Sequence, residues 1–331
     1  HSPTAVATTV HPSPLPSAST RFVDLLDWGE DSHLGIQIVG TGSTDWLGMS
    51  VSDAGDVNGD DISDIMIASR QADPQGRTDA GLVYLIFGKL GGILDVDTTS
   101  FGGVDGIQII GINSTQFGNS LSSAGDVNGD GFDDIIAGSV YYEGTSPTRS
   151  QAGMALILFG KRSGWTDVDM STFAAADGLG FRVIGENTFD RLGRSVSAAG
   201  DFNGDGYGDI LIGAMYGDNM SGGLDAGHAV VIYGHSNATF FGDIDLHYHV
   251  FTPSLGFKII GASAADCVGT SVTGGLDLNH DNFSDIVVGS SNAGIIYVLF
   301  GRSSYESYTN TTDLSILSSG SQDWGFRLTG I

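Results

Sequence analysis

The side chains in this sequence that are best placed to do chemistry belong to four short acidic segments with one spacing. They read DVNGDDISD from Asp56, DVNGDGFDD from Asp126, DFNGDGYGD from Asp201 and DLNHDNFSD from Asp277. Each has the form D-x-N-x-D-x-x-x-D, so side-chain oxygens recur at positions 1, 3, 5 and 9. Carboxylate and amide oxygens are hard donors, which suit Ca²⁺ and do not suit Zn²⁺ or copper. The spacing therefore predicts four calcium-binding loops.

We expect about four Ca²⁺ ions, each held by four side chains and by the main-chain carbonyl of position 7. Position 6 must turn sharply, which Gly131 and Gly206 allow. Asp61 and Asn282 stand there in the other two loops, and Asp and Asn are the non-glycine residues that best tolerate a left-handed backbone. The predicted ligands are Asp56, Asn58, Asp60, Ile62 and Asp64; Asp126, Asn128, Asp130, Phe132 and Asp134; Asp201, Asn203, Asp205, Tyr207 and Asp209; and Asp277, Asn279, Asp281, Phe283 and Asp285.

Two other interpretations of these loops were weighed. An EF-hand needs an acidic ligand at position 12 and flanking helices, whereas position 12 here is apolar, as at Ile67 and Val288. An acidic turn without metal remains the alternative, because Asp, Asn and Gly are ordinary turn residues. Four copies in register favour calcium. The loop from Asp277 fits least well, since His280 replaces the glycine of position 4.

Internal repeats place these loops at equivalent points along the chain. An apolar segment bounded by glycines precedes each loop, and an apolar segment ending in Phe-Gly or Tyr-Gly follows it, roughly every 70 residues. The first marker begins at Gly35, Gly106, Gly180, Gly256 and Gly325; the last begins at Tyr84, Leu156, Val230 and Tyr297. Four repeats are therefore complete, and a fifth begins.

Each repeat is predicted to form four short strands. In the first repeat these are Met49–Ala54, Asp64–Ala68, Gly81–Phe87 and Asp95–Ser100, which are rich in apolar residues and bounded by Gly, Asp or Ser. No segment keeps a helical period. Repeated units of four strands predict an all-β fold, a β-propeller of four-stranded antiparallel blades. A blade cannot bury both of its faces alone, so neighbouring blades must stack on it.

The string from Leu47 through GDVNGD, IAS and AGLVYLIFG resembles the FG-GAP repeat of integrin α-subunit heads and related extracellular proteins. The Phe-Gly pair is intact at Phe117-Gly118, and Leu192-Gly193 and Val268-Gly269 depart from it conservatively. The resemblance covers about residues 22–331. It implies a propeller, seven-bladed in typical members, with calcium between the first and second strands of several blades. It also implies an extracellular location, secreted or at the cell surface.

The domain organisation follows from these repeats. Residues 1–21 are expected to be a Ser/Thr/Pro-rich extended tail, and residues 22–331 the propeller. The ring should be incomplete, so that further blades, reaching seven, or a neighbouring chain would cover its open edge; closure with four blades is the alternative. Phe22–Leu26 is expected to join the last blade. The repeats span about 22–93, 94–165, 166–241 and 242–312, with a partial repeat over 313–331.

Composition excludes several classes of protein. Lys and Arg number 13 against 39 Asp and Glu, a net charge of −26, which argues against binding to nucleic acid or to an anionic membrane. No apolar run approaches the roughly 18 residues of a membrane span. Cys267, the one cysteine, is expected to be buried. Glycosylation is expected at Asn113, Asn219, Asn237 and Asn310, but not at Asn282 inside a calcium loop.

The predicted function is that of a non-catalytic adhesion or structural module; the alternative is the propeller domain of a lectin or of a secreted hydrolase. No G-x-S-x-G, H-E-x-x-H or P-loop motif appears. His247 and His249 have no third ligand nearby in sequence and are expected to be ordinary strand histidines. The loops between second and third strands differ between repeats, and the family places them away from calcium. A protein or glycan ligand is expected there, on Tyr141, Tyr142, Arg149 and Tyr216.

Overall fold

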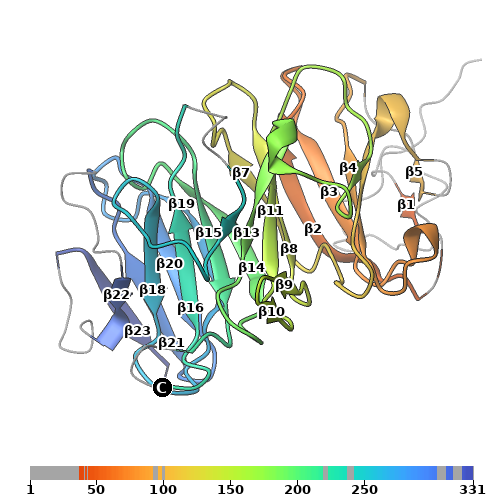
Figure 1. Ribbon diagram of the computed structural model, residues 1–331. Helices are drawn as coiled ribbons and strands as arrows, with labels where there is room; N and C mark the ends of the chain where they lie inside the picture. Colours follow the sequence, from red (N-terminus) through yellow and green to blue (C-terminus); the bar gives the residue numbers. More distant parts are fainter. Residues whose placement is uncertain are drawn as a thin grey trace, which may run out of the picture. The chain divides into compact units, whose positions relative to one another are not determined.

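The structure is a computed structural model of the 331-residue chain, and it describes residues 37–40, 42, 44–91, 96–98, 101–218, 223–236, 242–303, 311–315 and 323–330. The chain divides into two units, residues 1–37 and 38–331, and every described strand belongs to the second (Figure 1). The expected tail and the Phe22–Leu26 segment lie outside the described residues. The described part contains no α-helix, and so no helix long and apolar enough to cross a membrane.

Four antiparallel sheets repeat one plan, as the all-β prediction requires, and each is a blade of four strands. In each blade the strands pair in chain order, from the inner first strand to the outer fourth strand. Blade 1 contains β2 (Leu47–Gly55), β3 (Asp64–Ser69), β4 (Leu82–Ile86) and β6 (Gly106–Ile110); blade 2 contains β7 (Leu121–Gly125), β8 (Asp134–Ser139), β11 (Met154–Leu158) and β13 (Gly180–Ile184). Blade 3 contains β14 (Leu192–Gly200), β15 (Asp209–Ala214), β16 (His228–Ile232) and β18 (Gly256–Ile260); blade 4 contains β19 (Val268–Leu276), β20 (Asp285–Ser290), β21 (Ile295–Leu299) and β23 (Gly325–Thr329).

The middle strands are apolar along their whole length because both of their faces are covered. Every residue of β4 and β11 is buried, so these strands lack the polar and apolar alternation of a one-sided sheet. The core lies between successive blades. Val83 and Leu85 of blade 1, for example, share a cluster with Met154 and Leu156 of blade 2. Burial of this interface stabilises each blade only when its neighbour is present.

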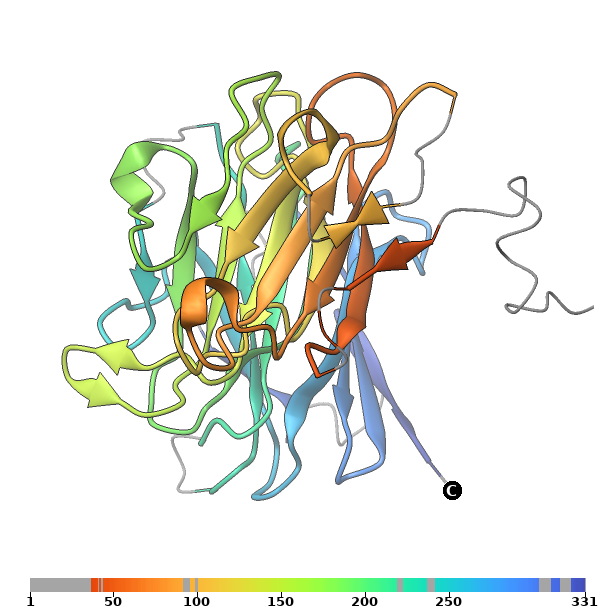
Figure 2. The same ribbon diagram turned by 90° about the vertical axis from the view of Figure 1, so that its right-hand side faces the viewer.

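The fourth strand of each blade differs from the sequence prediction. We expected Asp95–Ser100 to form it in the first repeat, but β6 (Gly106–Ile110) takes that place and pairs with β4. Within the expected segment only β5 (Val96–Asp97) is a strand, and it pairs in parallel with β1 (Ile38–Val39) at the edge of the sheet (Figure 2). The physical reason is length and burial, since five mostly apolar residues match β4 and the Asp-Val-Asp segment cannot.

Segments equivalent to β5 recur and join neighbouring blades, and we call them linking strands. They are β5, β12 (Val168–Asp169), β17 (Ile244–Asp245) and β22 (Thr311–Asp313). Each connects the third and fourth strands of its own blade and pairs in parallel with the outer strand of the preceding blade: β12 with β6, β17 with β13, and β22 with β18. They occupy edges that would otherwise expose unpaired backbone groups.

Candidate calcium sites

Each acidic loop joins the first two strands of its blade, so all four loops occupy equivalent positions. The first aspartate organises the turn. In the second loop, Asp126 Oδ1 accepts the N–H of Gly129 at 2.7 Å and that of Asp130 at 3.1 Å, and its Oδ2 accepts the N–H of Gly131 at 2.9 Å. The other three loops have the same arrangement. The loop backbone is thus wound around one carboxylate.

The turn at position 6 has the backbone conformation predicted from the sequence. Gly131 and Gly206 have φ of 88° and 91°, and Asp61 and Asn282 have φ of 64° and 70°. All four values lie in the left-handed region, which Asp and Asn adopt more readily than other side chains do. The departures from glycine in two loops therefore keep the same fold.

The aspartate at position 9 is fully buried in every loop. Asp134 Oδ2 accepts the N–H of Val127 and its Oδ1 that of Gly160, both at 2.8 Å. Burial, with the nearby charges of Asp130 and Asp126, raises the pKa of Asp134 to about 8 despite these bonds. The same causes raise the pKa of Asp64 to about 6 and those of Asp209 and Asp285 above their ordinary value. A nearby cation would favour the charged form of each.

The donors fit a hard cation in kind. The strongest sign is Asn58 Oδ1, a buried oxygen without any hydrogen-bond partner, because an oxygen left so costs free energy unless something coordinates it. In the other loops this oxygen accepts a backbone N–H, as from Asp130 to Asn128 at 3.0 Å. No three acidic, histidine or cysteine side chains in the described part of the chain converge as a ready metal cluster. The chemistry of the donors fits calcium, whereas the positions of the carboxylates follow their backbone bonds.

The loops of successive blades stack on one another, which the sequence analysis missed. Gly129, at position 4 of the second loop, lies under the ring of Tyr207, at position 7 of the third; a Cβ on this glycine would overlap the ring. Gly59 and Phe132 form the same pair between the first two loops, and Gly204 and Phe283 between the last two. The signal was visible as a glycine at position 4 and an aromatic residue at position 7 of the next repeat.

Comparison with known proteins agrees with this geometry. The family model described as FG-GAP repeat matches residues 50–86, 117–158, 192–233 and 268–299, one match for each blade. The chain carries four FG-GAP repeats. It is similar to integrin alpha pat-2 of Caenorhabditis briggsae (29% identical over 265 residues, 78% of this chain and 19% of that protein) and to that of Caenorhabditis elegans (28% over 262 residues, 78% and 19%). Integrin alpha-PS2 of Drosophila melanogaster is 24% identical over 274 residues, 82% of this chain and 16% of that protein. The chain thus spans about a fifth of the length of these relatives.

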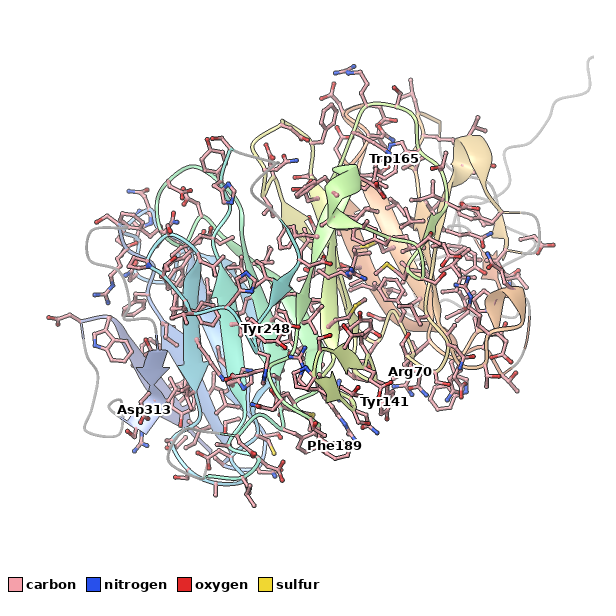
Figure 3. The ribbon with its side chains drawn as sticks, in the orientation of Figure 1. Arg70, Tyr141, Trp165, Phe189, Tyr248 and Asp313 are labelled. Carbon is pink, nitrogen blue, oxygen red and sulfur yellow. The ribbon has the colours of Figure 1, made fainter. Side chains whose placement is uncertain are left out.

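The ends of the FG-GAP blades away from the calcium loops carry exposed aromatic and arginine side chains. Figure 3 shows Arg70, Tyr141 and Phe189 along one end of the blades and Trp165 at the other end. The Arg191 guanidinium lies between the rings of Tyr141, at 5.4 Å, and Tyr216, at 4.9 Å. Two of the expected ligand residues, Tyr141 and Tyr216, are therefore brought together by an arginine that the sequence analysis did not single out.

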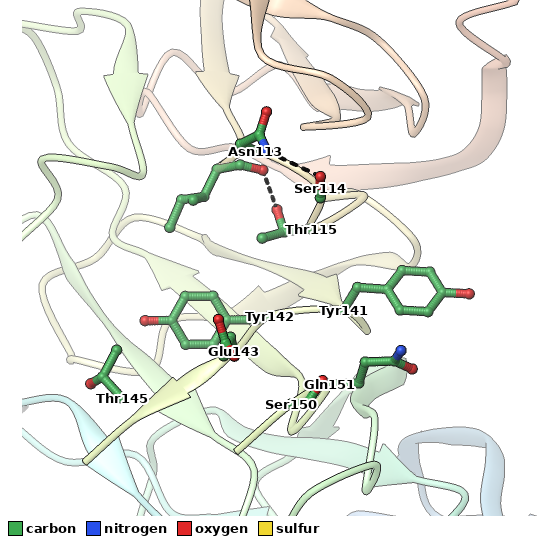
Figure 4. Close-up of a pocket in the computed structure, with 10 residues that line it drawn as sticks. Asn113, Ser114, Thr115, Tyr141, Tyr142, Glu143, Thr145, Ser150 and Gln151 are labelled. Carbon is green, nitrogen blue, oxygen red and sulfur yellow. Dashed lines mark hydrogen bonds between the residues drawn. The ribbon is translucent and has the colours of Figure 1, made fainter. Parts of the chain in front are cut away.

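The other two expected ligand residues are buried. Tyr142 is 8% exposed, and its ring points away from that of Tyr141 in the hollow of about 480 Å³ drawn in Figure 4. Arg149 is 3% exposed and donates to both carboxylate oxygens of Asp245 in linking strand β17. It also donates to the carbonyl of Gly185. This placement gives Arg149 a structural role between blades 2 and 3.

The remaining candidate residues have ordinary surroundings. His247 and His249 lie in the turn after β17 and not in a strand, as we had expected; each ring contacts a different carbonyl, of Glu186 at 3.1 Å and of Asp245 at 3.0 Å. Cys267 is buried, as predicted. Asn113 is exposed at the rim of the hollow in Figure 4, so its glycosylation stays a prediction. Asn219, Asn237 and Asn310 lie outside the described residues.

Proposed function

We propose that this protein is an extracellular, calcium-binding β-propeller that acts as a non-catalytic adhesion or structural interaction module. The observation that carries the proposal is the recurrence, in four equivalent loops, of a fully buried aspartate beside two further aspartates and an asparagine. Three carboxylates leave each empty loop with excess negative charge, and one Ca²⁺ would neutralise most of it. Extracellular modules of this kind bind Ca²⁺ with constants of roughly 0.1–1 mM, which suits an extracellular location.

In the second loop, Asp126, Asn128, Asp130 and Asp134 would hold the ion together with the Phe132 carbonyl, and the other loops would use the equivalent residues. The bound ion supplies positive charge where the first and second strands of a blade meet. The residues of the chain do the rest: Asp126 winds the turn, and Asp134 ties the loop to the backbone of its own blade. Because the loops stack through their aromatic residues, rigidity gained in one loop passes to the next.

The end of the blades opposite the calcium loops is the proposed ligand face, consisting of Tyr141, Tyr216, Arg191 and Phe189. Phe189 is 52% exposed with φ of 69°, a strained conformation that leaves a large apolar side chain in solvent. Exposed aromatic residues and arginine are typical of protein-binding surfaces. The similarity to integrin α chains supports a protein ligand.

A lectin or hydrolase domain is the alternative expected from the sequence. A propeller lectin would repeat one sugar pocket in each blade, with the same aromatic residue at the same position. Two residues beyond the end of the second strand, the four blades instead carry Gln71, Tyr141, Tyr216 and Asn292. This variation favours one composite surface over repeated pockets.

Calcium titration with calorimetry tests the first part of the proposal. We expect about four sites and a melting temperature that falls when a chelator is added, because a ligand that binds only the folded state stabilises it by mass action. Asn58→Ala should weaken one site yet leave the chelated protein unchanged, since the removed oxygen has no protein partner. An unmoved melting temperature in chelator would contradict calcium binding.

Binding to arrays of extracellular-matrix proteins and of glycans tests the second part. The protein should retain matrix proteins in the presence of Ca²⁺, and Arg191→Ala should reduce retention at least tenfold by releasing the two tyrosine rings. Leu224→Ala, at an exposed apolar side chain outside this face, is the control. Retention of glycans alone would favour the lectin alternative.

A further inference from the structure

The outward face of blade 4 is apolar and exposed, unlike the equivalent face of blade 3. Ile296 and Leu328 are 44% and 53% exposed. Register places them where blade 3 has Ala229 and Ile259, which are paired with one another and 0% exposed because blade 4 covers them. The same side chains that form the core between blades are thus open to solvent on blade 4.

Blades 1 to 3 each receive the first turn of the following blade in one way, and the junction between blades 3 and 4 shows it. Ser195 Oγ donates to the carbonyl of Gly269 at 2.9 Å, and Val268 N–H donates to the carbonyl of Ala226 at 3.0 Å. Gly213 lies so close to the Gly269 carbonyl that a Cβ would overlap it. We call the entering pair an apolar-glycine turn; the pairs are Phe117-Gly118, Leu192-Gly193 and Val268-Gly269.

Blade 4 has every group needed to receive such a turn. Ser271 and Gly289 stand where Ser195 and Gly213 stand in blade 3, and Gly294 where Gly227 stands. A Cβ on Gly227 would overlap the entering backbone, whereas nothing lies within 4 Å of one on Gly294. These residues, with Ile296 and Leu328, line a hollow of about 470 Å³, which we call the receiving face.

Blade 1 carries a matching turn that no preceding blade receives. Leu47-Gly48 begins β2 as the other apolar-glycine turns begin their first strands. Gly48 has φ of 83°, against 85° at Gly118 and 83° at Gly269. Space around Gly48 is open to 4 Å, whereas a Cβ on Gly118 or Gly269 would meet the preceding blade. The turn is formed before anything binds it.

The calcium loops at the two ends of the series are complementary as well. A glycine at position 4 accommodates the aromatic residue of the next loop, and only the loop of blade 4 has a larger residue there, His280. Only the loop of blade 1 lacks the aromatic residue at position 7, where it has Ile62. The two exceptions match each other, since a loop with Ile62 needs no glycine beneath a ring.

Position 2 of the loops supports the same pairing. Val57, Val127 and Phe202 are at most 1% exposed because the following blade covers them, while Leu278 in blade 4 is 52% exposed. The following blade also donates a backbone N–H to each covered carbonyl, as Lys161 does to Val57 at 2.9 Å. In blade 1 the residue equivalent to Lys161 is Lys89.

We propose that two copies of this chain associate head to tail, so that the receiving face of blade 4 in each copy holds the Leu47-Gly48 turn of the other. The two contacts are heterologous and close on each other, giving a ring of eight blades, within the range of known propellers. In this ring β23 of one copy pairs with linking strand β5 of the other. It replaces β1, which occupies the place of a preceding outer strand with only two residue pairs.

Sedimentation equilibrium in Ca²⁺ tests this directly. The expected mass is twice 34.3 kDa and does not grow further with concentration. Leu328→Asp should weaken association at least a hundredfold, because it places a charge on the receiving face. Leu224→Asp, at a side chain 68% exposed outside this face, should leave association unchanged. Gly48→Cys together with Gly289→Cys should give an intermolecular disulfide under oxidation, and neither single variant should.

A monomer at all concentrations would overturn the proposal and mean that another module covers blade 4. A mass that keeps rising would overturn the closed ring, since a heterologous contact that does not close gives filaments. A dimer unaffected by Leu328→Asp would place the interface elsewhere. Circular dichroism of each variant establishes that it is folded, and the cysteine pair tests the contact without altering the apolar face.

Discussion

Replacing Arg149 with methionine should destabilise the protein several times more than the same change at Arg77, although both arginines occupy the same place in the repeat. Each forms a two-pronged ion pair with the second aspartate of a linking strand, Asp245 for Arg149 and Asp169 for Arg77. Methionine keeps the apolar stem, so the comparison isolates the guanidinium. The two pairs differ in burial: the arginine side chains are 4% and 22% exposed.

The magnitude follows from what each guanidinium leaves behind. Loss of the buried one removes the charge partner of Asp245 and a donor to the Gly185 carbonyl, and breaking a buried pair costs about 3–5 kcal/mol. We therefore expect a loss of about 3 kcal/mol for Arg149→Met, since Asp245 itself is 21% exposed. The more exposed Arg77 pair should cost about 1 kcal/mol, because solvent screens it.

Urea unfolding in saturating Ca²⁺, followed by circular dichroism, measures both variants. Arg149→Lys keeps the charge but not the planar fork, so it should fall between wild type and Arg149→Met. Equal losses for Arg149→Met and Arg77→Met would refute the reasoning from burial. A loss below about 1 kcal/mol at Arg149 would show that the linking strand does not hold blades 2 and 3 together.

Two further predictions concern the loops and the pH dependence of stability. Gly129→Ala should cost about 2–3 kcal/mol, combining a left-handed backbone with overlap on Tyr207, whereas Gly131→Ala should cost only about 1 kcal/mol, because nothing lies within 4 Å of its Cβ position; equal thermal shifts would contradict the stacking of the loops. Burial raises the pKa of Asp190 to about 6, above the roughly 3.9 of an unfolded chain, so the native state binds more protons between these values. Its contribution is therefore complete below about pH 4 and lost as the pH rises through 6, about 3 kcal/mol in all, and Asp190→Asn should flatten that part of the stability profile measured by urea unfolding; a variant profile parallel to wild type would contradict it.

The calcium loops were predictable from sequence because their chemistry is local. Five ligand positions and one sharp turn lie within nine residues, so spacing alone places Asp126 and Asp134 in one loop and requires a left-handed residue between them. The blades were predictable for a similar reason, since strand markers recur in register. Local chemistry and repetition both survive without knowledge of which segments meet in space.

Contacts between blades were decided only by the tertiary structure. The fourth strand was misassigned because Asp95–Ser100 and Gly106–Ile110 both have strand composition, and only pairing with β4 separates them. Arg149 was expected to face a ligand because its loop is variable, yet Asp245, distant in sequence, buries it. Ile62 and His280 looked like minor departures until the stacking of loops showed what each position must contact. The sequence by itself determined the donors and the repeating unit; the packing of one unit on the next determined which side chains are buried, because burial depends on residues far away in the chain.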